Sequence, residues 1–282
     1  MKKIFVPTDF SVASRNACEY AASLASYLNA EVQLLHVHKE ILPATVGPEP
    51  WMITPGKKLI EKERLLDKEL EYLKSNYPVE VKGELETGST CKSIRTFSEK
   101  IDADLIILGV HKIKKHKILG STVLTILQKV KVPVLLIPEG VTFKPIKSMV
   151  VAVDFTEAIE GTVFDALHEI YKKFDAWVRV VHVDKKASDL KASEVSQKLR
   201  LGVALSRFDY QYEKLESDDV EEGIEKFVDS HPTDLLVLVE HHHTMYEKMF
   251  EKIHTKSLSS RINLPLLILK PNSLHASNRS LK

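Results

Sequence analysis

The segment KKIFVPTDFS, residues 2–11, recurs as KSMVVAVDFT at residues 147–156. Each copy is a short apolar run that ends in an aspartate, a phenylalanine and a hydroxyl residue. A run of this kind predicts a buried β-strand that stops where the polar residues begin. Its return at half-length predicts that the chain contains two copies of one structural unit.

Three further segments repeat in the same order. AEVQLLHVHKE from Ala30 matches AWVRVVHVDKK from Ala176, DADLIILGVHK from Asp102 matches HPTDLLVLVEHHH from His231, and KVPVLLIP matches NLPLLILKP. Ordered matches of this number indicate a tandem duplication. We therefore expect a first domain at residues 1–139, a linker at 140–146, a second domain at 147–271 and a polar tail at 272–282.

Each half reads as alternating strands and helices. In the first half, strand patterns at 4–9, 32–37, 79–86, 104–109 and 133–138 alternate with helical patterns at 11–28, 58–77, 91–101 and 121–130. Ser11 is the expected N-cap of the first helix, and the four prolines of residues 41–56 argue against helix there. Continuous apolar runs such as LIIL, separated by helices, indicate a mainly parallel sheet covered on both faces. The expected fold class is α/β, with two tandem doubly wound five-stranded sheets whose ligands bind beyond the carboxyl ends of the strands.

Composition disfavours several classes of function. Lys and Arg total 40 against 39 Asp and Glu, so no global basic field attracts nucleic acid. No apolar stretch reaches the roughly 18–20 residues that cross a bilayer, and the first apolar run is too short for a signal peptide. We therefore expect a cytoplasmic protein with no membrane partner. Motifs of metal hydrolases and P-loop enzymes are absent from the sequence, as is a nucleophile with its base, so no enzyme activity is expected.

The repeated motifs together resemble the universal stress protein family, in its tandem two-domain form. The resemblance covers nearly the whole chain and is carried by VPTDFS, VAVDFT, LLHVHKE, VVHVDKK, the ending ILGST with VPVLLIP, and NLPLLIL. It implies a fold like that of adenine nucleotide hydrolases and a regulatory role in stress response, through protein partners that the sequence does not name. Domains of this family usually pair through their last strands. Here PVLLIP and PLLIL would pair within one chain as a pseudo-dimer, and a further homodimer of chains stays open.

The resemblance also implies a site for ATP or AMP in the first half. Nucleotide-binding members have a G-x-x-G-x9-G-[ST] loop, an aspartate after the first strand and a valine after the second. Glycines let backbone N–H groups reach phosphate oxygens at the start of a helix. Carried over position by position, these sites are Asp9, Val37, Gly109, Lys112 in place of the second glycine, Gly120 and Ser121, in a loop two residues shorter than the motif.

The second half departs further from this pattern. Val239 replaces the first glycine, His242 the second, and Ile253 falls where the closing serine should be, although Asp154 and Val183 remain. No nucleotide is expected there.

Several residues admit two interpretations. The lysines at 112, 114, 115 and 117 are phosphate contacts or a solvated charged loop. Asp9 and Asp154 orient a ribose or cap the following helix. His241, His242, His243 and His254 are not expected to bind metal, because neighbours on an extended chain point in alternate directions. Cys18 is expected in the core, and Cys91 at a helix start without a catalytic partner.

Two functions remain in competition, and weak hydrolysis of ATP, for which the sequence shows no catalytic residues, is a third and less favoured one. The first is a regulator that binds ATP or AMP through the modified loop. The second is a protein-interaction module with a site that no longer binds nucleotide, in which the lysine-rich loop and the loop around Trp51 are the contact surfaces.

Overall fold

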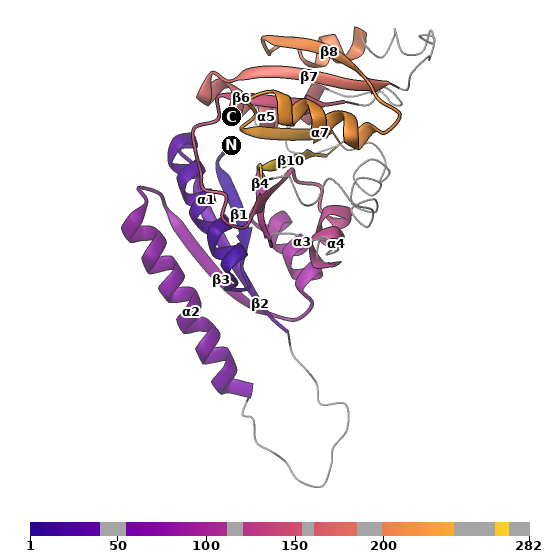
Figure 1. Cartoon of the computed structure of the whole chain (residues 1–282). Helices are drawn as coiled ribbons and strands as arrows, with labels where there is room; N and C mark the ends of the chain where they lie inside the picture. Colours follow the sequence, from indigo (N-terminus) through magenta and orange to yellow (C-terminus); the bar gives the residue numbers. More distant parts are fainter. Residues whose placement is uncertain (40–54, 112–120, 154–160, 185–198, 240–262, 271–282) are drawn as a thin grey trace.

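The computed structural model describes residues 1–39, 55–111, 121–153, 161–184, 199–239 and 263–270 (Figure 1). Strands and helices alternate through both halves, as the sequence predicted. The elements of the first half are β1 Lys3–Pro7, α1 Val12–Leu28, β2 Glu31–His38, α2 Pro55–Asn76, β3 Val81–Thr87, α3 Thr90–Lys100, β4 Leu105–Val110, α4 Ser121–Lys129 and β5 Val134–Pro138.

The second half repeats this order. Its elements are β6 Ser148–Ala152, the 3₁₀ turn η1 Gly161–Phe164, α5 Asp165–Phe174, β7 Trp177–Asp184, a helical segment at residues 199–204, β8 Tyr210–Glu216, α7 Val220–Ser230, β9 Leu235–Val239 and β10 Leu266–Leu269.

The described strands form one ten-stranded sheet in the order β3-β2-β1-β4-β5-β10-β9-β6-β7-β8. Each half contributes five strands in equivalent order, and every pairing within a half is parallel. The halves meet where β5 and β10 pair antiparallel, with Leu267 opposite Leu135. The predicted α/β fold with two five-stranded halves is therefore confirmed, as is the pairing of PVLLIP with PLLIL within one chain.

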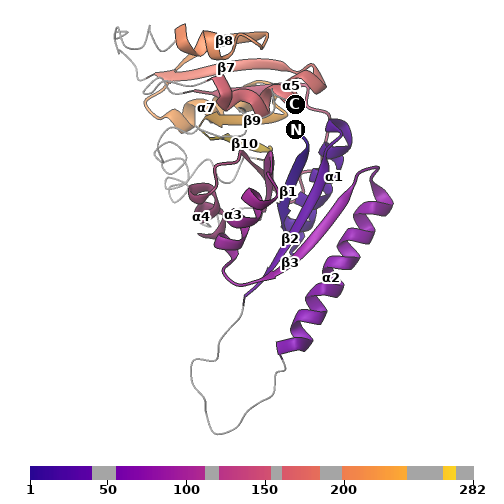
Figure 2. The same ribbon diagram turned by 180° about the vertical axis from the view of Figure 1, so that it is seen from behind.

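Helices cover both faces of the sheet (Figures 1 and 2). One apolar core lies beneath α1, α2 and α5, where Ala17, Leu24 and Leu167 are fully buried. The other lies beneath α3, α4 and α7, around Phe97 and Leu127. Both cores contain residues from the two halves, so burial of apolar surface stabilises the halves jointly.

Aromatic side chains close the joint between the halves. Phe143 of the expected linker packs against Tyr20 and Tyr27 of α1, with ring centroids 5.2 and 5.4 Å apart. Phe174 of α5 lies 5.4 Å from Tyr27 and completes the cluster. The α-amino group of Met1 adds an ion pair with Glu169 of α5 at 3.4 Å.

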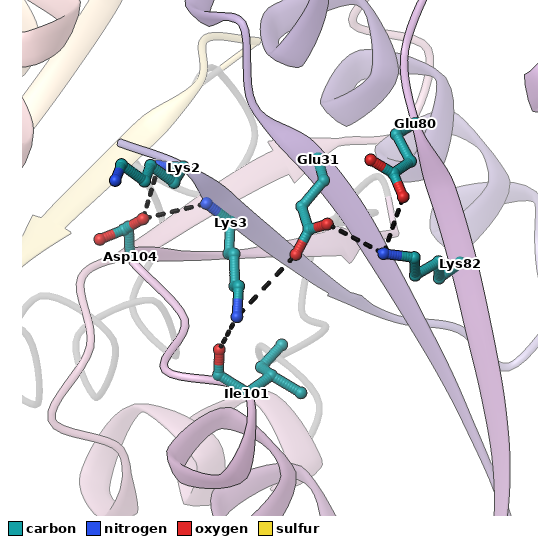
Figure 3. Close-up of polar contacts among 7 residues, drawn as sticks. All are labelled: Lys2, Lys3, Glu31, Glu80, Lys82, Ile101 and Asp104. Atoms are coloured by element: carbon teal, nitrogen blue, oxygen red, sulfur yellow. Dashed lines mark hydrogen bonds and ion pairs between the residues drawn. The ribbon is translucent and has the colours of Figure 1, made fainter.

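The same arrangement of hydrogen bonds to an aspartate recurs at the amino ends of β1 and β6. One carboxylate oxygen of Asp104 accepts hydrogen bonds from the backbone N–H groups of Lys2 and Lys3, at 2.6 and 2.9 Å (Figure 3). Asp234 accepts from the N–H groups of Lys147 and Ser148 in the same way, at 2.8 and 3.0 Å. The duplication has thus preserved a contact that fixes where each first strand starts.

Around Asp104 the first half has an ion-pair chain that runs across three strands (Figure 3). Glu31 joins Lys3 and Lys82, and Lys82 also contacts Glu80 at 2.7 Å. A surface pocket of about 580 Å³ opens beside this chain, lined by Lys2, Lys3, Ala25, Ser26, Asn29, Ala30, Glu31, Pro78, Val79 and Glu80. Lys3 and Glu31 of this lining pair with each other, and Glu80 pairs with Lys82. Because the pocket also lies opposite the carboxyl ends of the strands, we assign it no ligand.

The expectation that residues 41–56 contain no helix is wrong at the carboxyl end of that segment. Helix α2 begins at Pro55, within the proline-rich segment. Proline is favoured in the first turn of a helix, where its missing N–H would have had no partner. Residues 40–54, including the loop around Trp51, lie outside the described residues.

Candidate functional site

The candidate site lies at the carboxyl ends of β2, β1 and β4, which are neighbours in that order. The chain enters the sheet at β1, goes to β2 on one side, and later returns to β4 on the other. A strand order that reverses in this way leaves a crevice at the edge of the sheet, where α/β proteins bind ligands. Asp9, Val37 and Gly109 all lie at this edge. Lys112 and Gly120 lie outside the described residues.

Ser121 is the first residue of α4, and its side chain is exposed. Because α4 connects two parallel strands, β4 and β5, its first turn must lie toward the edge where β4 ends. The first N–H groups of α4 have no acceptor within the helix, and they lie with the positive end of its dipole on the side of the candidate site.

Asp9 stabilises the turn between β1 and α1 through hydrogen bonds. Its Oδ1 accepts the N–H of Ser11 at 2.9 Å, and the hydroxyl of Ser11 caps α1 by accepting the N–H of Ser14 at 3.2 Å. Desolvation opposes ionisation of Asp9, but hydrogen bonds from the Ser11 hydroxyl and N–H and from Ser14 outweigh it, so the pKa of Asp9 is lowered. Ser11 is confirmed as the N-cap. The carboxylate of Asp9 supports this cap through Ser11 and Ser14 without being the N-cap itself, and its task toward a ribose stays a prediction.

Gly109 has a packing role that the sequence did not reveal. A Cβ atom at this position would lie 2.1 Å from the carbonyl oxygen of Ala13 and 2.8 Å from the N atom of Ser14. The first turn of α1 therefore sits directly on the end of β4. Glycine is required here for the helix to approach, whether or not a ligand is bound.

Phe10 and His36 form a stack beside Asp9. Phe10 has φ of 64°, a left-handed conformation that is unusual for an aromatic residue, and its N–H donates to the hydroxyl of Thr8 at 3.1 Å. Its ring stacks on His36 with centroids 4.4 Å apart, and the ammonium of Lys62 lies 5.5 Å from the ring centroid on α2's side.

His36 is buried, and its Nδ1 lies 2.8 Å from the carbonyl oxygen of Thr8. The carbonyl only accepts, so Nδ1 carries the proton. Burial lowers the pKa of His36, and Lys62 lowers it further. Sequence reasoning missed this histidine, although its recurrence as His182 was visible: Nδ1 of His182 lies 3.0 Å from the carbonyl oxygen of Val153.

Beyond Gly109, the start of the lysine-rich loop is tied to the end of β5. Nδ1 of His111 lies 3.0 Å from a carboxylate oxygen of Glu139, and the N–H of Glu139 donates to the carbonyl of Val110 at 2.8 Å. Sequence reasoning did not single out Glu139. These contacts fix the chain one residue before Lys112.

The equivalent edge of the second half has different chemistry. Asp184 forms an ion pair with Lys214 at 2.7 Å and lies 3.4 Å from Nε2 of His182. The hydrogen bond from Lys214 is the main cause that lowers the pKa of Asp184. Val239 occupies the position that corresponds to Gly109, so the close approach that glycine allows between α1 and β4 has no equivalent residue at the end of β9. Asp154, His242 and Ile253 lie outside the described residues.

The remaining candidates from the sequence have structural roles or are not described. Cys18 is fully buried in the core, as expected, and burial raises the pKa of its thiol. Cys91 is half-buried in the first turn of α3. Among the described residues no group of His, Cys, Asp and Glu side chains could hold a metal ion, and His241 to His243 and His254 are outside them. In the described part of the chain no helix is long and apolar enough to cross a membrane.

Comparison with known proteins identifies the family. A sequence profile of the universal stress protein family matches residues 1–138. Universal stress protein MJ0531 of Methanocaldococcus jannaschii is 30% identical over 144 residues, which are 48% of this chain and 81% of that protein.

Two solved structures extend the similarity of fold to both halves. A universal stress protein from Archaeoglobus fulgidus DSM 4304 superposes with a TM-score of 0.70 at 18% identity, over 96% of this chain and 98% of that chain. One described as a putative universal stress protein, from Pseudomonas aeruginosa UCBPP-PA14, superposes with a TM-score of 0.59 at 14% identity, over 96% of this chain and 94% of that chain. The chain therefore belongs to the universal stress protein family, with its two halves as tandem domains of that fold.

Proposed function

We propose that this chain is a cytoplasmic stress-response regulator that binds an adenine nucleotide, ATP or AMP, in its first half through a modified glycine loop. The observation that carries the proposal is the meeting of Asp9, Val37 and Gly109 at one edge of the sheet, where the strand order reverses. These positions match the ones that nucleotide-binding members of the family use.

Each residue has a defined task in this proposal. The lowered pKa of Asp9 keeps its carboxylate ionised near neutral pH, as an acceptor for ribose hydroxyls. The backbone of Val37 meets the base. Ser121 and the first N–H groups of α4 hold the phosphates, helped by Gly120 and by the ammonium of Lys112 in place of a glycine amide.

A specific observation favours the alternative, a protein-interaction module without nucleotide. Gly109 is required for packing of α1 against β4, so its presence needs no ligand to explain it. In this alternative the lysine-rich loop and the loop around Trp51 are the contact surfaces. For the second half we propose no nucleotide site under either function, since Val239 replaces the glycine and Asp184 is paired with Lys214.

Calorimetry of Mg²⁺ and ATP with the whole chain tests the proposal. We expect one site per chain, lost or strongly weakened in Ser121→Ala and Gly120→Val. Ser230→Ala is the matched control, since its hydroxyl donates to Lys226 at the far end of α7 and its loss leaves binding unchanged. No heat at millimolar ATP, together with an unchanged melting temperature, would contradict nucleotide binding and favour the interaction module.

We further propose that nucleotide is bound and not turned over. Phosphate release measured over many turnovers checks this point separately. Release at a steady rate, abolished by Ser121→Ala, would assign the chain an ATPase activity and reject the proposal of binding alone.

A further inference from the structure

A buried lysine of the second half contacts the helix that starts at the candidate phosphate site of the first half. Lys270 follows β10 directly and is only 4% exposed. Its ammonium donates a hydrogen bond to the carbonyl oxygen of Leu127, in the last turn of α4. This contact joins residues 143 positions apart in the chain and crosses from one half to the other.

The sheet explains why these two groups meet. β10 pairs antiparallel with β5, with Leu266 opposite Leu136 and Ile268 opposite Val134. Continuing this register by two residues places Lys270 opposite Val132, in the short connection between α4 and β5. The end of β10 therefore passes beside the end of α4.

The chemistry of the contact suits a helix end. The last four carbonyl groups of a helix have no partner within it, and the end carries partial negative charge. A lysine ammonium satisfies such a carbonyl and interacts favourably with the dipole. A hydrogen bond to this carbonyl offsets part of the free energy that burial of the ammonium costs.

The contact has no counterpart in the first half. The aligned repeat places Pro138 at the position equivalent to Lys270, and proline has no cation to donate. The tie therefore runs in one direction, from the second half to α4 of the first half.

We propose that Lys270 is a positioning residue, through which the second half sets the nucleotide affinity of the first half. This inference rests on the proposed function, since the first turn of α4 is the proposed phosphate contact. Helix α4 spans nine residues, and helices this short are marginal without tertiary contacts. Release of its last turn lowers the fraction of molecules in which the first turn is formed, and with it the affinity for phosphate.

Variants at Lys270 test the proposal. Lys270→Met keeps an unbranched side chain, one atom shorter, and removes the charge, and we expect it to weaken binding of Mg²⁺ and ATP by about three- to tenfold. Lys270→Arg keeps the charge and restores most of the affinity. Lys226→Met is the control, because Lys226 pairs with Glu222 on the solvent side of α7 and its loss leaves affinity unchanged.

Hydrogen exchange without nucleotide gives a second readout that a general loss of stability would not reproduce. In Lys270→Met the amides of α4 exchange faster, while those of α1 and α3 keep their rates. Equal affinity and equal exchange of α4 in wild type and Lys270→Met would overturn the proposal. Should Lys270→Met fail to fold, Lys270→Gln replaces it in the same comparison.

Failure of the proposed function is distinguishable from failure of this inference. If the wild-type chain binds no ATP, the nucleotide proposal is rejected, and exchange of α4 alone decides the role of Lys270. Faster exchange confined to α4 would then uphold the tie from the second half, and unchanged exchange would reject it.

Discussion

At the end of β4, the absence of a side chain decides how closely α1 approaches the sheet. A methyl group on Gly109 would overlap the carbonyl of Ala13, which belongs to the backbone and has little room to move. We predict that Gly109→Ala lowers the free energy of unfolding by about 1–3 kcal/mol, the usual cost of overpacking. Urea denaturation of the wild type and of Gly109→Ala measures this difference in the free energy of unfolding.

Gly202 supplies the matched control for this substitution. It lies in the helical segment 199–204, where a Cβ would have the hydroxyl of Tyr210, at 3.9 Å, as its one neighbour within 4 Å among the described residues. Gly202→Ala should therefore leave stability unchanged or raise it by up to about 1 kcal/mol, because alanine favours helix. An equal loss in both variants would show that Gly109 has no special packing role.

His36, which lies beside the candidate site, makes the stability of the protein depend on pH. Burial lowers the pKa of His36, so the folded state favours the neutral ring. Its contribution to stability is present above the unfolded pKa of about 6.5 and is lost as the pH falls through the lower folded value. We predict that His36→Asn, which can still donate to Thr8, flattens the decline of stability between about pH 7 and pH 5. A histidine titration by NMR that placed the pKa of His36 above 6.5 would contradict the prediction.

At the scale of elements, an ion pair joins α2 to α1. Nε of Arg15 lies 3.3 Å from a carboxylate oxygen of Glu69, whose side chain is 6% exposed. Burial raises the pKa of Glu69, Arg15 opposes this shift, and Glu19 adds to it. The protonated form of Glu69 therefore stabilises the fold at low pH, and this contribution is lost as the pH rises through the folded pKa.

Removal of the Arg15 cation should raise the free energy needed to keep the carboxylate of Glu69 ionised in its buried position. We predict that Arg15→Met lowers the free energy of unfolding at neutral pH by about 1 kcal/mol, a modest value because Arg15 is exposed to water. The loss should shrink in acid, where Glu69 is protonated, and should be recovered in Arg15→Met/Glu69→Gln. A loss of the same size at about pH 4 and pH 7 would refute an electrostatic origin.

At the scale of the whole molecule, the repeat was sufficient to predict the fold. Apolar runs such as LIIL and VLLI, separated by helices, are typical of a covered parallel sheet, and their recurrence predicted both halves. The resemblance to the family predicted the β5–β10 joint. The start of α2 was missed because proline signals both a loop and a first helical turn.

The site was harder to predict than the fold. Asp9, Val37 and Gly109 were placed at one edge, because strand ends are visible in a sequence. The overlap of Gly109 with α1, the His36 stack and the contact of Lys270 with α4 depend on distances between segments far apart in the chain. Local periodicity has no information about such distances. The ligand tasks of Lys112, Gly120 and Ser121 remain predictions.

The shared sheet also predicts the association state. The apolar last strands β5 and β10 cover each other, and the outer strands β3 and β8 expose charged or polar residues such as Lys82, Glu84 and Gln211. Charged edges discourage pairing between molecules. We therefore predict a monomer, with a mass of 31.9 kDa by light scattering.

A variant in the joint makes this prediction sharper. Leu267→Asp places a carboxylate opposite Leu135 in the buried β5–β10 pair, and we expect it to separate the last strands and cause association through their apolar edges. Leu199→Asp is the matched control, since Leu199 is 70% exposed and tolerates a charge. A wild-type mass of twice the chain would contradict the prediction, because it would require an interface other than the last strands, which already pair within one molecule.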